Sequence, residues 1–162
     1  MTRISGQEAG IIAVSFLIAL LLTAIPLPDW AIAWRPAWLT MVLIYWCMVS
    51  PKRVSVGTGW LLGFLLDVLK GSLLGQHAAG FALVAFITVK AHRRIRVFPL
   101  AQQALFVGSM IALNGLLTLW IQTVIGLPPQ YTSFWLPVLT SMPLWPWLYI
   151  ILSDLRLKAQ AS

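Results

Sequence analysis

The stretch SVGTGWLLGFLLDVLKGSLLG, residues 55–75, places small residues and one acid at every fourth position of an apolar segment. Positions i and i+4 lie on one face of an α-helix, so the spacing predicts a ridge of small residues along one helix. Such a ridge lets a second helix backbone approach closely, as in the GxxxG packing of membrane helices. That second helix belongs either to the same chain or to another protein. The members of this small-residue ladder are Ser55, Gly59, Gly63, Asp67, Gly71 and Gly75.

Asp67 is the one acid of the ladder, and Lys70 follows it after about one helical turn. We expect Asp67 to be a structural tie. It either pairs with Lys70 at i,i+3 or accepts hydrogen bonds from the backbone at the start of the next helix. Both residues are expected near the outer edge of the membrane. An acid inside a membrane segment is also a candidate for ion or substrate handling, and that alternative stays open.

The composition indicates a membrane protein. Of the 162 residues, 60% are hydrophobic and 9% are charged, whereas soluble domains carry about 25% charged residues. A soluble fold of this length has too much surface in water to hide so many apolar side chains. The single cysteine, Cys47, excludes an intrachain disulfide and a cysteine-based metal site. We expect it to be a small buried hydrophobic residue.

Six apolar segments alternate with short stretches of proline, glycine and charged residues, and each segment predicts a membrane-spanning helix. Several are shorter than the ~20 residues that a span needs, so flanking residues are expected to extend the helices. The predicted fold is all-α, a single polytopic membrane domain over residues 1–162. The predicted spans are residues 11–26, 36–49, 54–69, 72–89, 100–125 and 134–152.

The basic residues predict the topology, because cytoplasmic loops carry an excess of Lys and Arg. With a cytoplasmic N-terminus, nine of the eleven basic residues fall on the cytoplasmic side, and only Arg35 and Lys70 fall outside. Both termini are therefore expected in the cytoplasm. Four of the nine form a predicted loop that fixes topology, contacts anionic lipid or meets an acidic cytoplasmic partner. These four are Lys90, Arg93, Arg94 and Arg96.

Other polar residues lie inside the predicted spans. Asn114, Thr118 and Gln122 are four residues apart, and we expect them to hydrogen-bond across helices or to line a polar cavity. His77, in the fourth span, is expected to be packed or hydrogen-bonded. His77 and Asp67 alone do not make a metal site, which needs at least three ligands.

The last span combines prolines with aromatic residues. Its three prolines remove backbone donors and predict a bent helix. Trp145, Trp147 and Tyr149 are expected to form an aromatic belt at the inner membrane interface.

The sequence contains none of the residue sets that catalysis requires. It has no Ser/His/Asp set, no paired carboxylates, no HExxH, no phosphate-binding loop, and four acidic residues in total. We therefore expect a non-enzymatic protein without cofactor or metal. The basic residues flank apolar segments as topology signals do, so a nucleic-acid partner is not expected.

The segment RPAWLTMVLIYWCMVSPKRVSVGTGWLLGFLLDVLKGSLLG, Arg35 to Gly75, resembles the MreD family of bacterial rod shape-determining membrane proteins. The layout from Ser15 to Asp29, without the family's leading tryptophan, and the ending LWPWL, residues 144–148, are also similar to that family. The likeness covers nearly the whole chain, and its length and number of predicted spans agree with it.

The resemblance implies a non-enzymatic scaffold of the cell-wall elongation machinery in the bacterial cytoplasmic (inner) membrane. It implies association with a single-span MreC-like protein. Through that protein it implies a link between the MreB filament and peptidoglycan synthesis by RodA and its penicillin-binding protein. On this hypothesis, the ridge Ser55–Gly59–Gly63 binds the partner's helix or a second copy of the chain, with membrane lipids around it.

The alternative hypothesis is a small-ligand-binding or transport subunit, because the family's fold is suspected to be similar to that of the substrate-binding subunits of vitamin importers. It rests on Asp67, His77, Asn114 and Gln122, which would line a polar cavity. A structure that packs these residues without a shared cavity argues against it.

Overall fold

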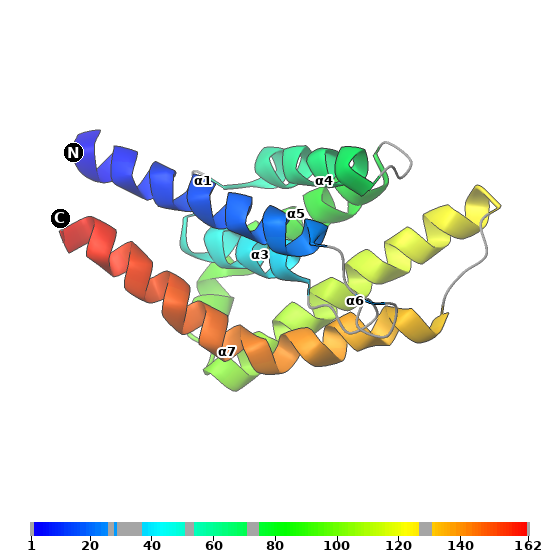
Figure 1. Cartoon of the computed structure of the whole chain (residues 1–162). Helices are drawn as coiled ribbons and strands as arrows, with labels where there is room; N and C mark the ends of the chain where they lie inside the picture. The colour runs from blue at the N-terminus through cyan, green and yellow to red at the C-terminus, as the bar shows by residue number, and fades with distance from the viewer. Residues whose placement is uncertain are drawn as a thin grey trace.

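The computed structural model describes residues 2–25, 28, 37–50, 54–70, 75–126 and 131–161 of the chain. Within these ranges all regular structure is helical, which confirms the predicted all-α class, and each helix overlaps one predicted span (Figure 1). Residues 71–74, which include Gly71, lie outside the described part. The helices are α1 (Thr2–Ala24), α3 (Trp38–Val49), α4 (Val56–Lys70), α5 (Gln76–Arg96), α6 (Leu100–Val124) and α7 (Tyr131–Ala161).

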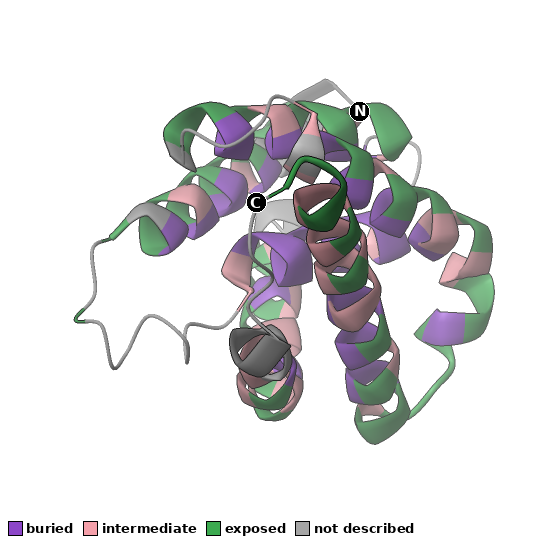
Figure 2. Ribbon diagram, turned by 90° about the vertical axis from the view of Figure 1, so that its right-hand side faces the viewer, coloured by how far each residue is buried: buried purple, intermediate pink, exposed green. Residues whose placement is uncertain are grey.

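Helix α3 is the centre of the fold. Every residue from Leu39 to Met48 is buried, as expected for a helix that is apolar on all sides. Helices α1, α5 and α7 pack around it, and Figure 2 shows buried positions facing inward and exposed positions facing outward. The 12 residues of α3 extend about 18 Å at 1.5 Å per residue. The helix is therefore shorter than the ~30 Å hydrocarbon core of a bilayer.

Helix α4 is antiparallel to α5, because Gly59 meets Phe81 and Gly63 meets Ala78. Helix α6 is antiparallel to α7, because Gln103 meets Trp145 and Gly108 meets Met142. The Nε1 of Trp46 in α3 donates to the Oγ of Ser15 in α1 over 2.8 Å. The Nε1 of Trp145 in α7 donates to the Oε1 of Gln103 in α6 over 3.3 Å. Figure 1 shows the N-terminal end of α1 and the C-terminal end of α7 on the same side of the molecule.

Two described segments are long and apolar enough to cross a membrane, namely Leu100–Val124 and Leu136–Lys158. Only 28% and 22% of their most apolar windows are buried inside the protein, whereas the core helix of a soluble protein is mostly buried. Their apolar side chains therefore face the surroundings, as in a protein that lies in lipid. Shorter apolar helices cover Ala9–Thr23, Trp38–Val49 and Val56–Leu69.

Helix α7 contains Pro137, Pro143 and Pro146, and Figure 1 shows that it changes direction along its length. This agrees with the loss of backbone donors at proline. The expected aromatic belt is wrong for Trp145, which is completely buried, whereas Trp147 is exposed. The hydrogen bond to Gln103 satisfies the indole N–H of Trp145 inside the protein, so this side chain does not need the membrane interface.

Helices α4 and α5 form the most extensive helix pair of the described chain. A Cβ atom added at Gly59 would lie 2.7 Å from the carbonyl oxygen of Phe81, and one added at Gly63 would overlap the backbone of His77 and Ala78. Only glycine leaves room for this approach of the two backbones. The ladder of α4 therefore packs against α5 of the same chain.

We predict that Gly63→Ala destabilises the protein, because the added methyl group overlaps backbone atoms that cannot move aside. Such overpacking costs about 1–3 kcal/mol. Gly57→Ala is the matched control, since nothing lies within 4 Å of a Cβ there. The midpoint of thermal unfolding in detergent should fall for Gly63→Ala and stay unchanged or rise for Gly57→Ala. Equal midpoints for the two variants would contradict the packing described here.

Candidate functional site

Asp67 lies in the last turn of α4, and its side chain is completely buried. Its carboxyl oxygens accept hydrogen bonds from the backbone N–H groups of Gly75 and His77, each over 2.9 Å, and of Ala78 over 3.4 Å. These N–H groups belong to the first turn of α5, where a helix leaves its donors without intrahelical partners. Asp67 thus caps α5 from a neighbouring helix, where a negative group is also favoured by the helix dipole.

Gly75 gives the chain the turn that this cap requires. It precedes α5 with a φ of +98°, in the left-handed region that glycine adopts without a steric penalty. The turn directs the N–H groups of Gly75 and His77 back toward Asp67. Of the two ties predicted for Asp67, the structure shows the one to the backbone, and the side chain of Lys70 lies outside the described part.

His77 completes the contacts of Asp67. Its Nδ1 lies 2.7 Å from the Oδ1 of Asp67, and its ring meets the ring of Phe81 edge to face at 6.4 Å between centroids. The side chain of His77 is 14% exposed. Among the described residues, no third His, Cys, Asp or Glu joins the pair in a set that could hold a metal ion. We call Asp67, Gly75, His77 and Ala78 the α4–α5 clasp.

The small-residue ladder is divided between three environments. Gly59 and Gly63 are closed off by α5, so the hypothesis that they form a face for a second protein is wrong in this structure. Ser55 precedes α4 and is half-buried, and its carbonyl accepts the N–H of Gly59 over 3.0 Å. Gly75 belongs to the clasp.

The polar row of α6 does not form one site. The Oδ1 of Asn114 faces Gly80 of α5 and has no hydrogen-bond partner among the described residues. The hydroxyl of Thr118 donates to the backbone carbonyl of Asn114 over 2.9 Å, within α6 itself. Gln122 is half-buried. Because Gly80 lies three residues after His77, Asn114 approaches α5 about one turn beyond the clasp.

The four basic residues Lys90, Arg93, Arg94 and Arg96 are all exposed. They were predicted to form a loop after a span ending at Val89, but α5 continues to Arg96. Cationic side chains stabilise the C-terminal turn of a helix through its dipole, which explains why the helix runs on. Lys90 also lies over the ring of Phe86, at 4.5 Å from its centroid.

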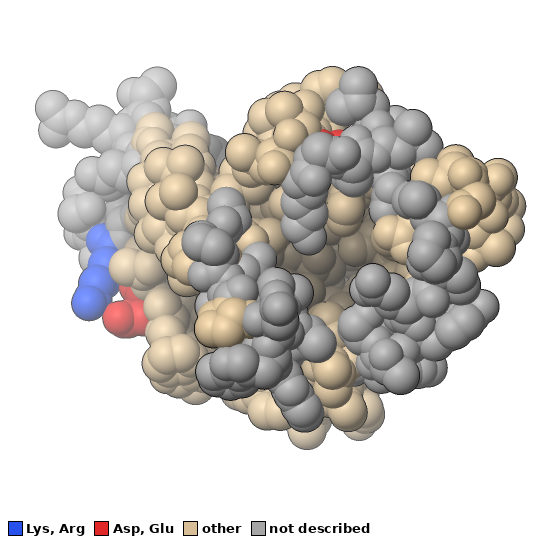
Figure 3. All heavy atoms as spheres, turned by 45° about the vertical axis from the view of Figure 1, so that its right-hand side comes forward, with Lys and Arg blue, Asp and Glu red and all other residues tan. Residues whose placement is uncertain are grey.

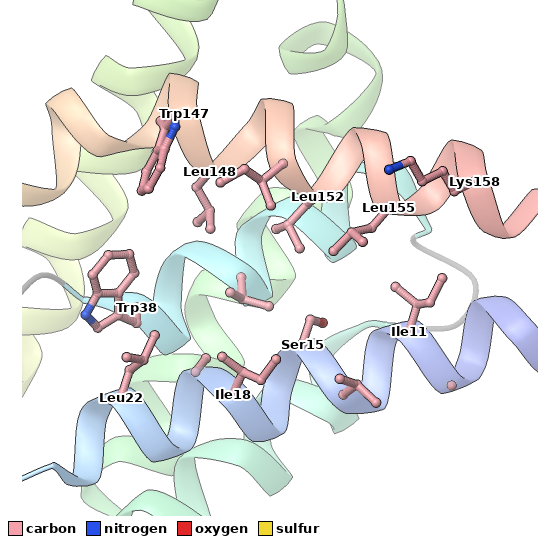
Figure 4. A pocket seen from close by; sticks show the side chains of 15 residues that line it. Ile11, Ser15, Ile18, Leu22, Trp38, Trp147, Leu148, Leu152, Leu155 and Lys158 are labelled. Atoms are coloured by element: carbon pink, nitrogen blue, oxygen red, sulfur yellow. The ribbon is translucent and has the colours of Figure 1, made fainter.

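The sequence did not predict a cavity of about 780 Å³ between α1 and α7, with α3 as its floor (Figure 4). None of the predicted polar residues lines it. The residues that line the groove are as apolar as those on the outer surfaces of the helices, so hydropathy alone does not indicate the groove. We call it the α1–α7 groove. Its lining residues in the middle are Ser15, Ile18, Val42 and Leu152.

We predict that Asp67→Ala destabilises the protein by at least about 3 kcal/mol, since several buried donors lose their acceptor at ~1–3 kcal/mol each. Asp67→Asn keeps one acceptor oxygen and should lower the free energy of unfolding by about half as much. The control is Asp154→Ala, which removes an exposed acid whose one ion pair among the described residues is with Lys158 at i,i+4, and which is expected to cost about 0.5 kcal/mol or less. The midpoint of thermal unfolding in detergent should fall most for Asp67→Ala, less for Asp67→Asn and least for Asp154→Ala. A loss for Asp67→Ala no larger than that of the control would contradict the clasp.

Comparison with known proteins agrees with this picture. A family model described as rod shape-determining protein MreD matches residues 7–155. Rod shape-determining protein MreD of Haemophilus influenzae is 31% identical over 145 residues, which cover 90% of each chain. No solved structure matches the chain. The two long apolar helices fit insertion into a membrane. The chain therefore belongs to the MreD family of rod shape-determining proteins, which are bacterial membrane proteins.

Proposed function

We propose that this chain is a non-enzymatic membrane scaffold of the cell-wall elongation machinery, which maintains rod shape by binding partner proteins. The observation that carries the proposal is the structural role of Asp67. The one acid at the centre of the sequence pattern is fully engaged in holding α5 against α4, so it is not free for proton or ion transfer. What the protein presents to its surroundings is apolar helix surface.

We propose that the helix bundle spans the bacterial inner membrane as six alternating segments, with the short α3 enclosed by the other helices and both termini in the cytoplasm. The antiparallel packing of α4 with α5 and of α6 with α7 supports this topology, as do the two chain ends on one side of Figure 1. The exposed basic end of α5, Arg93 to Arg96, is a further support, because positive charge favours the cytoplasmic side. Figure 3 shows a face on which the described charged side chains are few, with a Lys or Arg and an acid at the left and a small acidic area near the top, and the other described atoms are uncharged.

The proposed partner is an MreC-like single-span protein, with an indirect link to the MreB filament, RodA and its penicillin-binding protein. Since α5 covers the glycines of α4, such a helix must contact surfaces that point away from the chain. The outer side of α4 offers Trp60, which is 51% exposed and stacks on Phe64 at 5.5 Å. The outer side of α6 offers Trp120, which is 66% exposed. Tryptophan is, with Tyr and Arg, among the side chains that most often carry the binding energy of protein–protein interfaces.

The alternative function as a small-ligand-binding or transport subunit finds less support. Asp67 and His77 are bonded to each other, and Asn114 faces the backbone at Gly80. The α1–α7 groove contains none of these residues and not Gln122 either. Among the described residues, the polar contacts of Asp67 and His77 are thus made within the protein itself.

We predict that the full chain, co-expressed with its MreC-like partner and extracted in mild detergent, retains that partner through affinity purification. In a rod-shaped bacterium that lacks its own family member, the chain should restore the ratio of cell length to width. Trp60→Ala and Trp120→Ala are the two test variants, and Leu139→Ala, exposed on α7, is the control. Each variant is compared at equal membrane abundance.

The proposal expects at least one tryptophan variant to lose partner and cell shape together. Retention of no partner by the wild-type chain would overturn the scaffold function. Restored shape in a variant that no longer retains the partner would overturn it as well, because shape would then not depend on the scaffold contact.

A further inference from the structure

The α1–α7 groove has two chemically different ends. Figure 4 shows Leu22 and Trp38 opposite Trp147 at one end, and Ile11 opposite Leu155 and Lys158 at the other. Side chains of α1 and α7 point toward one another across the space between the helices. The groove is thus apolar along its length and carries a cation at the end where both chain termini lie.

The walls of the groove offer few polar groups, namely the indole N–H groups of Trp38 and Trp147 at one end and the ammonium group of Lys158 at the other. Ser15 carries the one hydroxyl group among the lining residues, and this group already makes two hydrogen bonds within the protein. It accepts from the Nε1 of Trp46 over 2.8 Å and donates to the carbonyl of Ile12 over 2.8 Å. A hydrocarbon chain needs no hydrogen-bond partners, so it suits this lining, whereas a sugar or a peptide does not.

The length of the groove selects a lipid tail over a spanning helix. Its lining extends from Gly10 to Leu22 on α1 and from Trp147 to Lys158 on α7. At 1.5 Å per residue these stretches are about 18 Å and 17 Å long. One leaflet of the hydrocarbon core is about 15 Å thick, and the whole core is ~30 Å. A partner helix would run well past the groove, while one acyl chain ends within it.

The charge at the lip of the groove selects the headgroup. The Nζ of Lys158 lies 3.3 Å from the Oδ2 of Asp154, and both side chains are well exposed. Such an i,i+4 pair is weak in water, so the ammonium group is available to a stronger anion. A lipid phosphate next to the tail that fills the groove provides that anion.

We propose that the α1–α7 groove holds one acyl chain of an anionic phospholipid, with Lys158 bound to its headgroup phosphate. The occupant comes from the leaflet that faces the chain termini. The proposal rests on the chain being a membrane protein and does not depend on the scaffold function. Bound in this way, the lipid fills the space between α1 and α7 and joins the two terminal helices of the fold.

Native mass spectrometry of the full chain in detergent tests the proposal, with phosphatidylglycerol and phosphatidylethanolamine added in turn. We expect one phosphatidylglycerol per wild-type chain. Ile18→Trp and Leu155→Trp put a large side chain into the groove at positions that are partly exposed, so they should lose the lipid and still fold. Leu157→Trp is the control, because Leu157 is exposed on the same helix and does not line the groove.

Lys158→Ala tests the headgroup contact. One basic residue near anionic lipid favours binding by about fivefold, so the preference for phosphatidylglycerol over phosphatidylethanolamine should fall by about that factor. Lipid binding that is equal in wild type and both groove-filling variants would overturn the proposal. So would an unchanged headgroup preference in Lys158→Ala. Loss of the MreC-like partner in the groove-filling variants, without loss of lipid, would assign the groove to a partner helix instead.

Discussion

The fold depends on how the N–H groups at the start of α5 find hydrogen-bond acceptors inside an apolar molecule. A helix begins with N–H groups that have no partner within the helix, and leaving them buried and unbonded is costly. Asp67 supplies the acceptors from α4, and Gly59 and Gly63 let α4 come close enough to do so. Because α5 also packs on α3 and α6, the clasp positions the helices on both sides of the pair.

Polar side chains inside this protein hold helices together, and its outer surfaces are left for interaction. Ser15 and Trp46 join α1 to α3, and Gln103 joins α6 to the buried Trp145 of α7. Each bond satisfies a polar group that lipid cannot satisfy. Because these groups are paired within the chain, binding of other molecules depends mainly on apolar contacts and on charges at the ends of the helices. A shape-determining scaffold and a groove for a lipid tail both use those features.

The sequence predicted the helices and the role of Asp67 because both depend on local spacing. Asp67 lies near the end of one predicted span, and the next span begins a few residues later, so the two are close along the chain. The surroundings of Trp145 and the α1–α7 groove were not predictable in this way. In a membrane protein, side chains that face lipid are as apolar as those in the core, so hydropathy does not tell them apart. The extension of α5 through its basic end was missed because charges were taken to end the helix, whereas at a C-terminus they stabilise it.

The proposed bundle has alternating spans and both ends in the cytoplasm, and labelling of single cysteines tests this arrangement most directly. Cys47 is completely buried, so Cys47→Ala provides a cysteine-free chain. Arg94→Cys, Leu157→Cys and Ile125→Cys then place one exposed thiol at three helix ends. A maleimide that cannot cross the inner membrane should label Ile125→Cys from outside, and the other two only after that membrane is permeabilised. Labelling of Arg94→Cys and Ile125→Cys from the same side would contradict the account.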